Sequence, residues 1–400
     1  MSAPQQAIVV GAGLAGAAAA RALADKGWQV LVLERGSEVC SGGSAVPVGV
    51  MSCHVSIDDN PLSQLTREGL MWTRRFAQAH LEEGVDWLGN GVLERRFTPE
   101  GEPKKAWRQP LDESVWHTHV RLATPEQLAL AGLSEDQVQS LWQPQGAWIK
   151  PAAMVKALLK HEAIEVQTRA EVESMQRNPT SGEWTLRIQN HIAIPNMGSS
   201  HTYSSESAPH VVLALGAHTP DFLNQVLYVD HMGLHPIAGQ VSWGLMANPE
   251  TTTWPPYAVN GHGSFVSGVP TADGAAWYTG ATFERNAIST AVSAQGHAEN
   301  EKRLGELLPM AQQQLATQWA DASQLRAWTG ARCASVNRLP KVGLLDEAQF
   351  PGLHLLTAMG SRGLTQSLLC AEVLACQMNH QAVPVSDSLM QAMRCQWPST

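Results

Sequence analysis

Three glycines near the start of the chain have the spacing of a phosphate-binding turn. Gly11, Gly13 and Gly16 follow an apolar run and precede an Ala-rich segment. In a strand–turn–helix unit, the first glycine allows the tight turn, the second admits a pyrophosphate to the backbone, and the third lets helix and strand pack closely. The start of the predicted helix, at Leu14 and Ala15, would present free N–H groups and a positive dipole end to the phosphates.

An acidic residue completes this unit. Glu34 lies 18 residues after Gly16 and ends a second apolar run, Gln29–Leu33. An acid at this place in a βαβ unit hydrogen-bonds the ribose hydroxyls of a dinucleotide and disfavours a 2′-phosphate. The pattern therefore predicts a dinucleotide site that includes Glu34 and the adjoining Arg35. A Gly-rich turn in an unrelated α/β protein is the alternative.

The residues after the second strand favour FAD over NAD. A nicotinamide-dependent enzyme usually continues with regular strand–helix units, whereas this chain continues with small residues at Ser41, Gly42 and Gly43. Such a loop suits contact with more of an extended cofactor. A further buried strand comes only at 210–215, and Gly216 after it suits close passage beside the cofactor.

Composition places the chain among ordinary globular proteins. Of its 400 residues, 44% are hydrophobic and 16% charged, which excludes a disordered or collagen-like chain. The formal net charge of −9 argues against general nucleic-acid coating but leaves room for local basic patches. The 6 cysteines form no C-x-x-C pair, which indicates free thiols in a reducing, cytoplasmic compartment. No run of 18 apolar residues occurs, so no membrane span is expected.

Three later segments resemble the FAD-dependent amino-acid oxidase superfamily, which includes D-amino acid and glycine oxidases. These segments are Gly146–Pro151, Gly330–Gly343 and Gly360–Glu372. The resemblance implies FAD as cofactor, a carboxylate-binding side chain at Arg332, and an adenine contact through the backbone of Val172. It also implies a loop that contacts the flavin and leads into a helix, whose N-terminus would stabilise charge on the reduced ring. The residues of that loop are Gly360, Ser361, Arg362, Gly363 and Leu364.

A narrower resemblance lies within that superfamily. The strings GSRGL and GARCASVNRLPKVG are similar to flavoprotein domains that modify the wobble uridine of bacterial tRNA. This implies oxidation of the C–N bond of a carboxymethylaminomethyl group, giving aminomethyl-uridine and glyoxylate. The alternatives are oxidation of free glycine, sarcosine or D-amino acids, and a flavin-binding scaffold without turnover. Because the chain opens on the dinucleotide motif, we expect a stand-alone oxidoreductase or a fragment of a fusion.

Contact of an acidic protein with tRNA would need local basic stretches. The candidates are Arg74-Arg75, Arg95-Arg96, and Lys104-Lys105 with Trp107-Arg108. A solvated face is the alternative for each of them. The 15 histidines form no H-x-x-x-H or H-E-x-x-H pattern, so no metal site is expected. The pattern singles out no general base.

The order of these features predicts an α/β fold in which a Rossmann-like FAD-binding domain is interleaved with a mostly antiparallel β substrate domain. The FAD-binding domain would comprise 1–52, 145–235 and 330–385. The substrate domain would comprise 53–144 and 236–329, and 386–400 would form a C-terminal tail. Locally, we expect a strand over 166–172, a flexible hairpin tip over 196–209, and a helix over 291–319.

Overall fold

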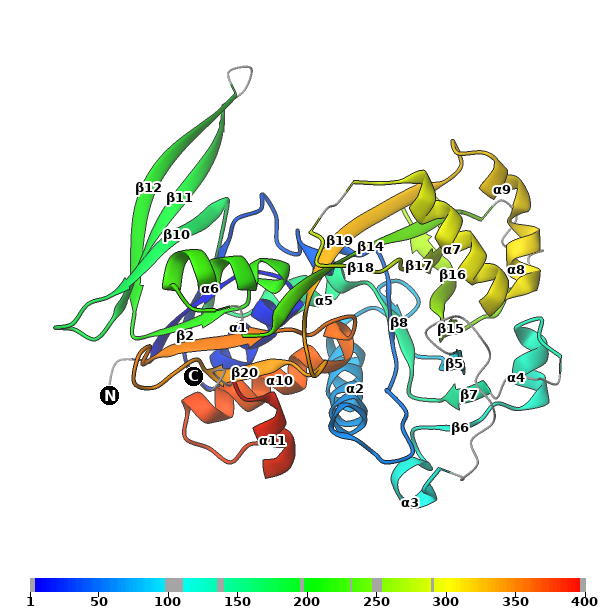
Figure 1. Ribbon diagram of the computed structural model, residues 1–400, viewed down its shortest axis with the longest axis horizontal. Coiled ribbons are helices and arrows are strands. Elements are labelled where there is room, and N and C mark those ends of the chain that lie inside the picture. The colour runs from blue at the N-terminus through cyan, green and yellow to red at the C-terminus, as the bar shows by residue number, and fades with distance from the viewer. Residues whose placement is uncertain are drawn as a thin grey trace.

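The computed structural model describes residues 4–97, 111–134, 140–194, 198–230, 232–246, 254–288 and 291–395. Within these residues the strands form four sheets, and the helices are distributed around them (Figure 1). Parallel and antiparallel sheets occur together, so the predicted mixed α/β fold class is confirmed.

The central sheet of the first part contains six described strands. In order across the sheet they are β20 (Lys341–Leu344), β21 (Leu353–Thr357), β13 (His210–Leu213), β1 (Gln6–Val10), β2 (Gln29–Glu34) and β9 (Ile164–Thr168). All neighbours pair in parallel except β20 and β21. Their short apolar runs are buried on both faces. Val9 and Val32 belong to one core with the Ala-rich helix residues 17–20. Ile8 and Leu33 belong to another core with Trp184 and Leu186 of a neighbouring sheet.

One face of this sheet is covered by a helix made mostly of alanine. Helix α1 (Leu14–Ala24) begins directly after the glycine turn, and its Ala17, Ala19 and Ala20 have no exposed surface. Alanine combines high helix propensity with a small side chain. The helix can therefore lie against the sheet and also against its neighbours α5 (Pro151–Leu159) and α10 (Gly363–Met378).

A second group of strands forms the other part of the molecule. Nine described strands belong to it, and they are β18 (Glu284–Arg285), β14 (Leu234–Leu245), β17 (Gly274–Gly280), β16 (Gly263–Thr271), β15 (Ala258–Gly261), β5 (Val92–Arg95), β7 (Ser140–Gln143), β6 (Arg121–Leu122) and, against β14, β19 (Arg326–Ser335). The described strands in it pair antiparallel except β15 with β5, which pair in parallel. The helices α7 (Ala294–Leu307), α8 (Pro309–Gln314) and α9 (Ala316–Ala320) lie at its outer side (Figure 1).

The predicted domain boundaries remain a proposal, and two strands bear on them. The six-stranded sheet takes its strands from 1–52, 145–235 and 330–385, the ranges expected for the FAD-binding domain. Strands β14 and β19 run across the proposed boundaries near 235 and 329. They pair with each other from Leu234–Ser335 to Trp243–Arg326, so one ladder continues from one part into the other.

The local expectations need three corrections. The strand expected at 166–172 is divided between β9 and β10 (Ala170–Arg177), because Arg169 adopts a left-handed φ of 57° between them. The segment expected to be a hairpin tip forms the edge strand β12 (Gly198–Ala208), paired with β11 (Trp184–Ile194). The helix expected over 291–319 is broken before Pro309, whose ring removes a backbone donor.

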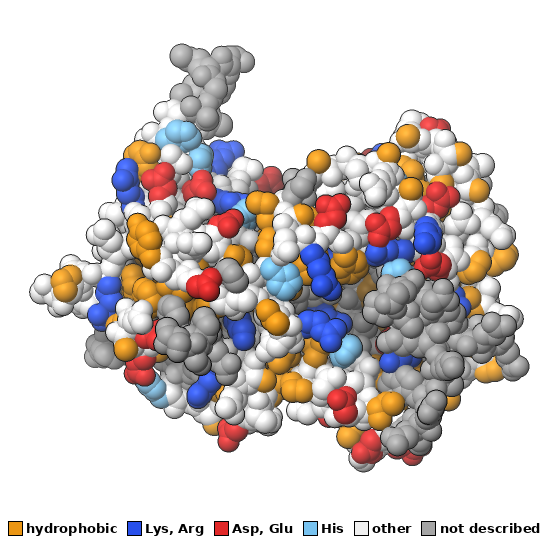
Figure 2. Space-filling view, in the orientation of Figure 1, with side chains coloured by type: hydrophobic (Ala, Val, Ile, Leu, Met, Phe, Trp, Pro, Cys, Tyr) orange, Lys and Arg blue, Asp and Glu red, His pale blue; other side chains and the backbone are white. Residues whose placement is uncertain are grey.

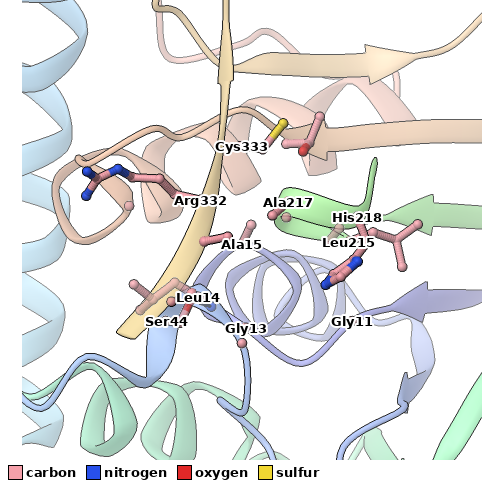
Figure 3. Close-up of a pocket in the computed structure, with 18 of the residues that line it drawn as sticks. Gly11, Gly13, Leu14, Ala15, Ser44, Leu215, Ala217, His218, Arg332 and Cys333 are labelled. Carbon is pink, nitrogen blue, oxygen red and sulfur yellow. Dashed lines mark hydrogen bonds between the residues drawn. The ribbon is translucent and has the colours of Figure 1, made fainter. Parts of the chain in front are cut away.

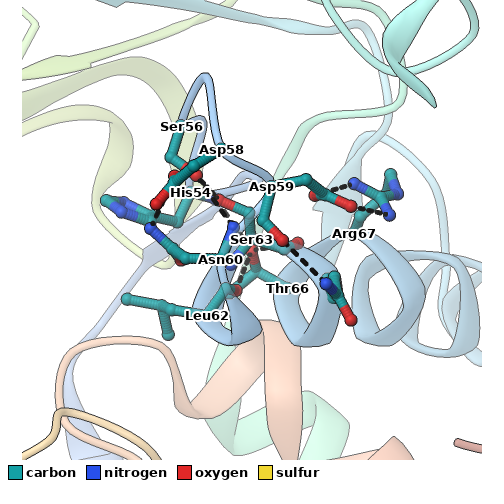
Figure 4. Close-up of polar contacts among 10 residues, drawn as sticks. His54, Ser56, Asp58, Asp59, Asn60, Leu62, Ser63, Thr66 and Arg67 are labelled. Carbon is teal, nitrogen blue, oxygen red and sulfur yellow. Dashed lines mark hydrogen bonds and ion pairs between the residues drawn. The ribbon is translucent and has the colours of Figure 1, made fainter. Parts of the chain in front are cut away.

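Two three-stranded sheets and five further helices complete the described part of the fold, and one of these sheets contains β10, β11 and β12. A small sheet contains β3 (Gly49–Met51), β8 (Ala147–Ile149) and β4 (Trp87–Leu88), and the remaining helices are α2 (Pro61–His80), α3 (Glu113–Trp116), α4 (Pro125–Leu130), α6 (Thr219–Leu227) and α11 (Asp387–Met393). Figure 4 shows how α2 begins: the Asn60 side chain accepts a hydrogen bond from the Ser63 N–H at 3.1 Å, and Asp59 forms an ion pair with Arg67. This cap satisfies one of the free N–H groups of the first turn.

Candidate cofactor and substrate cleft

The glycine turn has the close backbone packing that its sequence predicts. Gly11 has a φ of 105°, and a Cβ added there would lie 2.6 Å from the carbonyl oxygen of Ala214. A Cβ added at Gly16 would lie only 1.8 Å from the Gly11 carbonyl oxygen. A side chain at Gly11 would push the turn away from the backbone after β13, and one at Gly16 would push α1 away from the turn, so the geometry requires glycine at both positions.

Glu34 holds together the two loops that follow β1 and β2. Its Oε2 accepts a hydrogen bond from the Ala12 N–H at 2.8 Å, and its Oε1 accepts from the Gly36 N–H at 2.7 Å. Oε1 also accepts from the Ser41 hydroxyl at 3.0 Å. The carboxylate is therefore fixed at the end of β2, where we propose that its remaining lone pairs accept from the ribose hydroxyls of the cofactor.

These residues line a cleft of about 900 Å³. The predicted site residues in its wall are Gly11, Gly13, Leu14, Ala15, Glu34, Arg35, Ser41, Gly42, Val172, Gly216, Arg332, Gly360, Ser361, Gly363 and Leu364. Two predicted residues, Gly16 and Arg362, are not in the wall. Gly16 acts behind it, through the packing of α1 on Gly11. Figure 3 shows Arg332 and His218 at opposite sides of the labelled group, with Ala15 and Ala217 between them.

The later segments bring a second set of small residues to the cleft. Gly216 and Gly360 both have a φ of 55°, a conformation that glycine adopts without strain. The N–H of Gly360 donates to the Cys333 carbonyl at 2.8 Å, which ties the loop before α10 to β19. Helix α10 then begins at Gly363 in the cleft wall, so its positive end lies at the cleft.

Arg332 is the cation that β19 places in this wall. Its Nη2 lies 3.5 Å from the Thr282 carbonyl oxygen, and among the described residues no ion pair includes it. Burial, with the nearby cations Arg303 and Arg362, lowers the pKa of its guanidinium to about 10. It therefore stays protonated at neutral pH, as a partly desolvated cation that an anion would stabilise.

Arg362 has a different place from the one predicted. It is the residue before α10 and is outside the cleft wall, although Ser361 and Gly363 on either side belong to it. Burial, followed by the charge of Arg338, lowers the pKa of its guanidinium. The backbone of the loop can meet the cofactor, and the Arg362 side chain adds positive charge behind Arg332.

Several polar residues in the cleft wall were not predicted, and Ser44 and His218 are two that contact predicted residues. The Ser44 hydroxyl accepts from the Leu14 N–H at 3.1 Å, at the first turn of α1. His218 lies with its Nε2 2.6 Å from Nη2 of Arg35, and burial, followed by the charge of Arg35, lowers its pKa. Ser44 continues the small-residue run already noted at 41–43, so that run was its signal. No sequence pattern indicates His218, because it follows β13, which is far in sequence from the strand that precedes Arg35.

The cleft fits an extended dinucleotide. Its volume is in the upper range for small-molecule sites, and small residues from separate segments form its wall. A Cβ added at Gly13 would lie 3.1 Å from Ser44 Oγ. It would occupy the space beside the start of α1, where a pyrophosphate would lie. Glu34 and Arg332 give the cleft an acid at one place and, at another, a cation that forms no ion pair with the described residues. Fold and cleft together define a Rossmann-type dinucleotide-binding oxidoreductase.

Comparison with known proteins makes this class specific. The model of the DAO family, FAD dependent oxidoreductase, matches residues 6–377. The chain belongs to this family of FAD-dependent oxidoreductases, and the predicted FAD cofactor is confirmed at this level. Among curated proteins, the tRNA 5-methylaminomethyl-2-thiouridine biosynthesis bifunctional protein MnmC of Paracidovorax citrulli is 39% identical over 98% of this chain and 60% of its own length. The protein of the same name from Polaromonas naphthalenivorans is 39% identical over 96% of this chain and 58% of its own length.

Solved structures share the fold at lower identity. Glycine oxidase from Geobacillus kaustophilus superimposes with a TM-score of 0.71 at 17% identity, covering 98% of this chain and 99% of that one. Iminodiacetate oxidase from a Chelativorans species has a TM-score of 0.66 at 20% identity, covering 95% of this chain and 97% of that one. The chain thus matches oxidases of this fold along nearly their whole length. It spans about 60% of the length of the curated relatives.

Two further observations concern other classes of site. No helix in the described ranges is both long and apolar enough to cross a membrane. In the same part of the chain, no three His, Cys, Asp or Glu side chains are grouped so as to hold a metal ion.

Proposed function

We propose that the protein oxidises the C–N bond of a carboxymethylaminomethyl group on the wobble uridine of tRNA, giving aminomethyl-uridine and glyoxylate. The geometric observation that carries the proposal is Arg332, a cation in the cleft wall for which the described residues supply no carboxylate. A carboxymethylamino group would supply one. The tRNA part of the proposal is supported by the relatives, whose name states tRNA 5-methylaminomethyl-2-thiouridine biosynthesis.

The reaction needs few protein groups beyond those that hold the substrate. FAD, when bound, accepts the hydride from the methylene carbon that lies between the amine nitrogen and the carboxylate. Loss of that hydride and of the amine proton leaves an imine, and addition of water cleaves the imine to glyoxylate and the primary amine. A bidentate contact of Arg332 with the carboxylate would fix the reacting carbon, and such positioning supplies a large part of the rate. The positive end of α10 would stabilise the negative charge on the reduced flavin ring.

The predicted basic stretches contribute unequally to a tRNA surface. Arg95 is only 7% exposed and donates to the Glu306 and Leu307 carbonyl oxygens, so its assignment as an RNA contact is wrong. Arg74 donates to the Gln145 and Gly89 carbonyl oxygens, whereas the adjacent Arg75 is exposed. The stretch 104–108 lies outside the described residues.

Figure 2 shows other basic side chains in a position that suits an anionic partner. Blue Lys and Arg side chains and pale-blue His side chains lie near the middle of this face, over the junction of the two parts. A local patch of this kind is compatible with the net charge of −9, because screening limits the reach of distant acidic groups. These surface cations support contact with a phosphate backbone.

The test is anaerobic reduction of the flavin. The FAD-loaded protein is mixed without oxygen with tRNA that carries the carboxymethylaminomethyl group, and in parallel with glycine, sarcosine and a D-amino acid. Loss of the visible flavin absorbance measures oxidation, and glyoxylate is determined in the same samples. We expect the tRNA to reduce the flavin and release glyoxylate.

The other outcomes have definite meanings. Reduction by the free amino acids alone would replace the tRNA proposal with that of a small-amino-acid oxidase or dehydrogenase, the alternative that the sequence left open. No reduction by any of them would contradict both substrate proposals. Fully modified tRNA, which lacks the carboxymethyl group, is the control and should leave the flavin oxidised.

A further inference from the structure

Phe283 contacts the proposed carboxylate-binding arginine at the edge of the cleft. We propose that this aromatic ring stacks on the uracil of the substrate, so that Phe283 is a specificity-determining residue that distinguishes a nucleoside-linked amine from a free amino acid. The inference rests on the proposed function and adds to it the residue that recognises the base.

Two guanidinium groups fix the position of Phe283. Cζ of Arg332 lies 4.4 Å from the centroid of its ring, and Cζ of Arg303 lies 5.5 Å from the same centroid. The backbone before the ring is held by the same two residues. Arg303 donates to the Ala281 carbonyl at 2.7 Å, and Arg332 makes the 3.5 Å contact with the Thr282 carbonyl. The ring is thus preorganised beside the cation.

Phe283 is nevertheless half open to solvent. Its exposed fraction is 52%, although a large apolar side chain is usually buried. Phe283 is not in the cleft wall itself, but Arg332 and Ala281 are, and so is Ile288, which is 47% exposed. The apolar surface therefore borders the cleft at the end where Arg332 lies. This is the place where the part of a substrate beyond its carboxylate and amine would emerge.

The chemistry of the proposed substrate fits this arrangement. In a carboxymethylaminomethyl-uridine only two methylene groups and one nitrogen separate the carboxylate carbon from the ring. A carboxylate held by Arg332 therefore leaves the uracil within reach of an aromatic side chain that touches Arg332. Enzymes that act on a base extrude it from the stack and commonly hold it against aromatic side chains. Free glycine or sarcosine has no ring and cannot use this contact.

The test compares ligands with and without the base. We would measure the Kd of 5-carboxymethylaminomethyl-uridine from the concentration dependence of anaerobic flavin reduction, and the Kd of glyoxylate, a ringless carboxylate, from the perturbed flavin spectrum. Loss of one base–aromatic stack is expected to weaken the nucleoside about 5- to 150-fold in F283A. F283Y should restore its binding, whereas F283L, which keeps apolar bulk without a ring, should not. The Kd of glyoxylate should be the same in all of them.

The chain contains a matched control for an exposed aromatic residue beside an arginine. Tyr203 on β12 is 53% exposed, and its ring centroid also lies 4.4 Å from Cζ of an arginine, Arg187 on β11. Y203A should leave both Kd values unchanged.

Each failure can be told apart. If the wild-type flavin is reduced by neither the nucleoside nor the tRNA, the proposed function is wrong and this inference falls with it. If the wild-type flavin is reduced but F283A binds the nucleoside as Y203A does, the stacking role alone is wrong. Equal loss of nucleoside and glyoxylate binding in F283A would also overturn it, because the ring would then act only by placing Arg332.

Discussion

At the scale of single residues, replacing Glu34 tests its proposed contact with the cofactor. Its carboxylate accepts hydrogen bonds from Ala12, Gly36 and Ser41, and we propose that it also accepts from the cofactor ribose. Glu34→Ala should weaken FAD about 10- to 100-fold, because each hydrogen bond to a charged group contributes about 1.5 to 3 kcal/mol. Titration of the apoprotein with FAD, followed by flavin fluorescence, gives this Kd. An unchanged Kd would limit Glu34 to holding the loops.

Arg332 should oppose stability while it supports binding. Its pKa is lowered to about 10, so the charged form is disfavoured in the folded protein. This cost is fully present at neutral pH and lessens only as the pH rises through about 10. Arg332→Met should therefore raise the unfolding temperature of the apoprotein at neutral pH. It should also weaken a carboxylate ligand at least about 100-fold, since two charge-assisted hydrogen bonds are lost.

Thermal unfolding with and without glyoxylate measures both effects of this substitution. Glyoxylate should raise the unfolding temperature of the wild type and leave that of Arg332→Met unchanged. Arg187→Met, which removes an exposed arginine from its place beside Tyr203, is the control and should change neither quantity. A lower unfolding temperature in Arg332→Met would mean that its contacts with Thr282 and Phe283 outweigh the cost of the buried charge.

At the scale of elements, two glycines of one turn should respond differently to the same substitution. A Cβ at Gly16 meets a backbone oxygen at 1.8 Å, and backbone cannot move aside cheaply. Gly16→Ala should lower the free energy of unfolding of the apoprotein by about 3 kcal/mol. A Cβ at Gly13 meets only the Ser44 hydroxyl, at 3.1 Å, and a side chain can rotate away. Gly13→Ala should fold normally and bind FAD at least about tenfold more weakly, because the methyl group keeps the pyrophosphate from the backbone.

Urea unfolding of both apoproteins, together with FAD titration, distinguishes these roles. If Gly13→Ala were the less stable of the two variants, the proposed division between packing and cofactor contact would be reversed.

The elements that the sequence predicts well are those with local signals. The unit β1–α1–β2 is encoded by adjacent apolar runs, three glycines and Glu34, and each of these lies where its spacing indicates. The edge strand β12 was missed because its Ser-rich residues have low apolar content, and pairing with β11 along its whole length overrides that weak propensity. His218 follows β13 and Phe283 follows β17, and the tertiary fold brings the ends of these strands near the site. Local sequence patterns carry no information on contacts between segments that are distant in the chain.

At the scale of the whole molecule, the two sheets are joined by continuous strands and also by the cleft. Strands β14 and β19 extend from beside the six-stranded sheet into the larger antiparallel one. The cleft wall takes Gly239 and Val241 from β14, Arg332 from β19, and the glycine turn from the other side. A cofactor in this cleft would contact both parts.

Unfolding should therefore be a single transition that FAD shifts as a whole. A ligand that binds only the folded state adds about 1.4 kcal/mol to the free energy of unfolding for each tenfold rise in its concentration above Kd. Urea unfolding can be followed in each part by single-tryptophan fluorescence, with Trp28 packed against the first sheet and Trp277 buried in the second. We expect the two tryptophans to report the same urea midpoint, and we expect FAD to raise both midpoints by the same amount. At the same FAD concentration, the stabilisation of Gly13→Ala should be smaller by about 1.4 kcal/mol for each tenfold loss of affinity. Two separate midpoints, with FAD raising only that of Trp28, would mean that the parts unfold independently and that the cofactor is held by the first part alone.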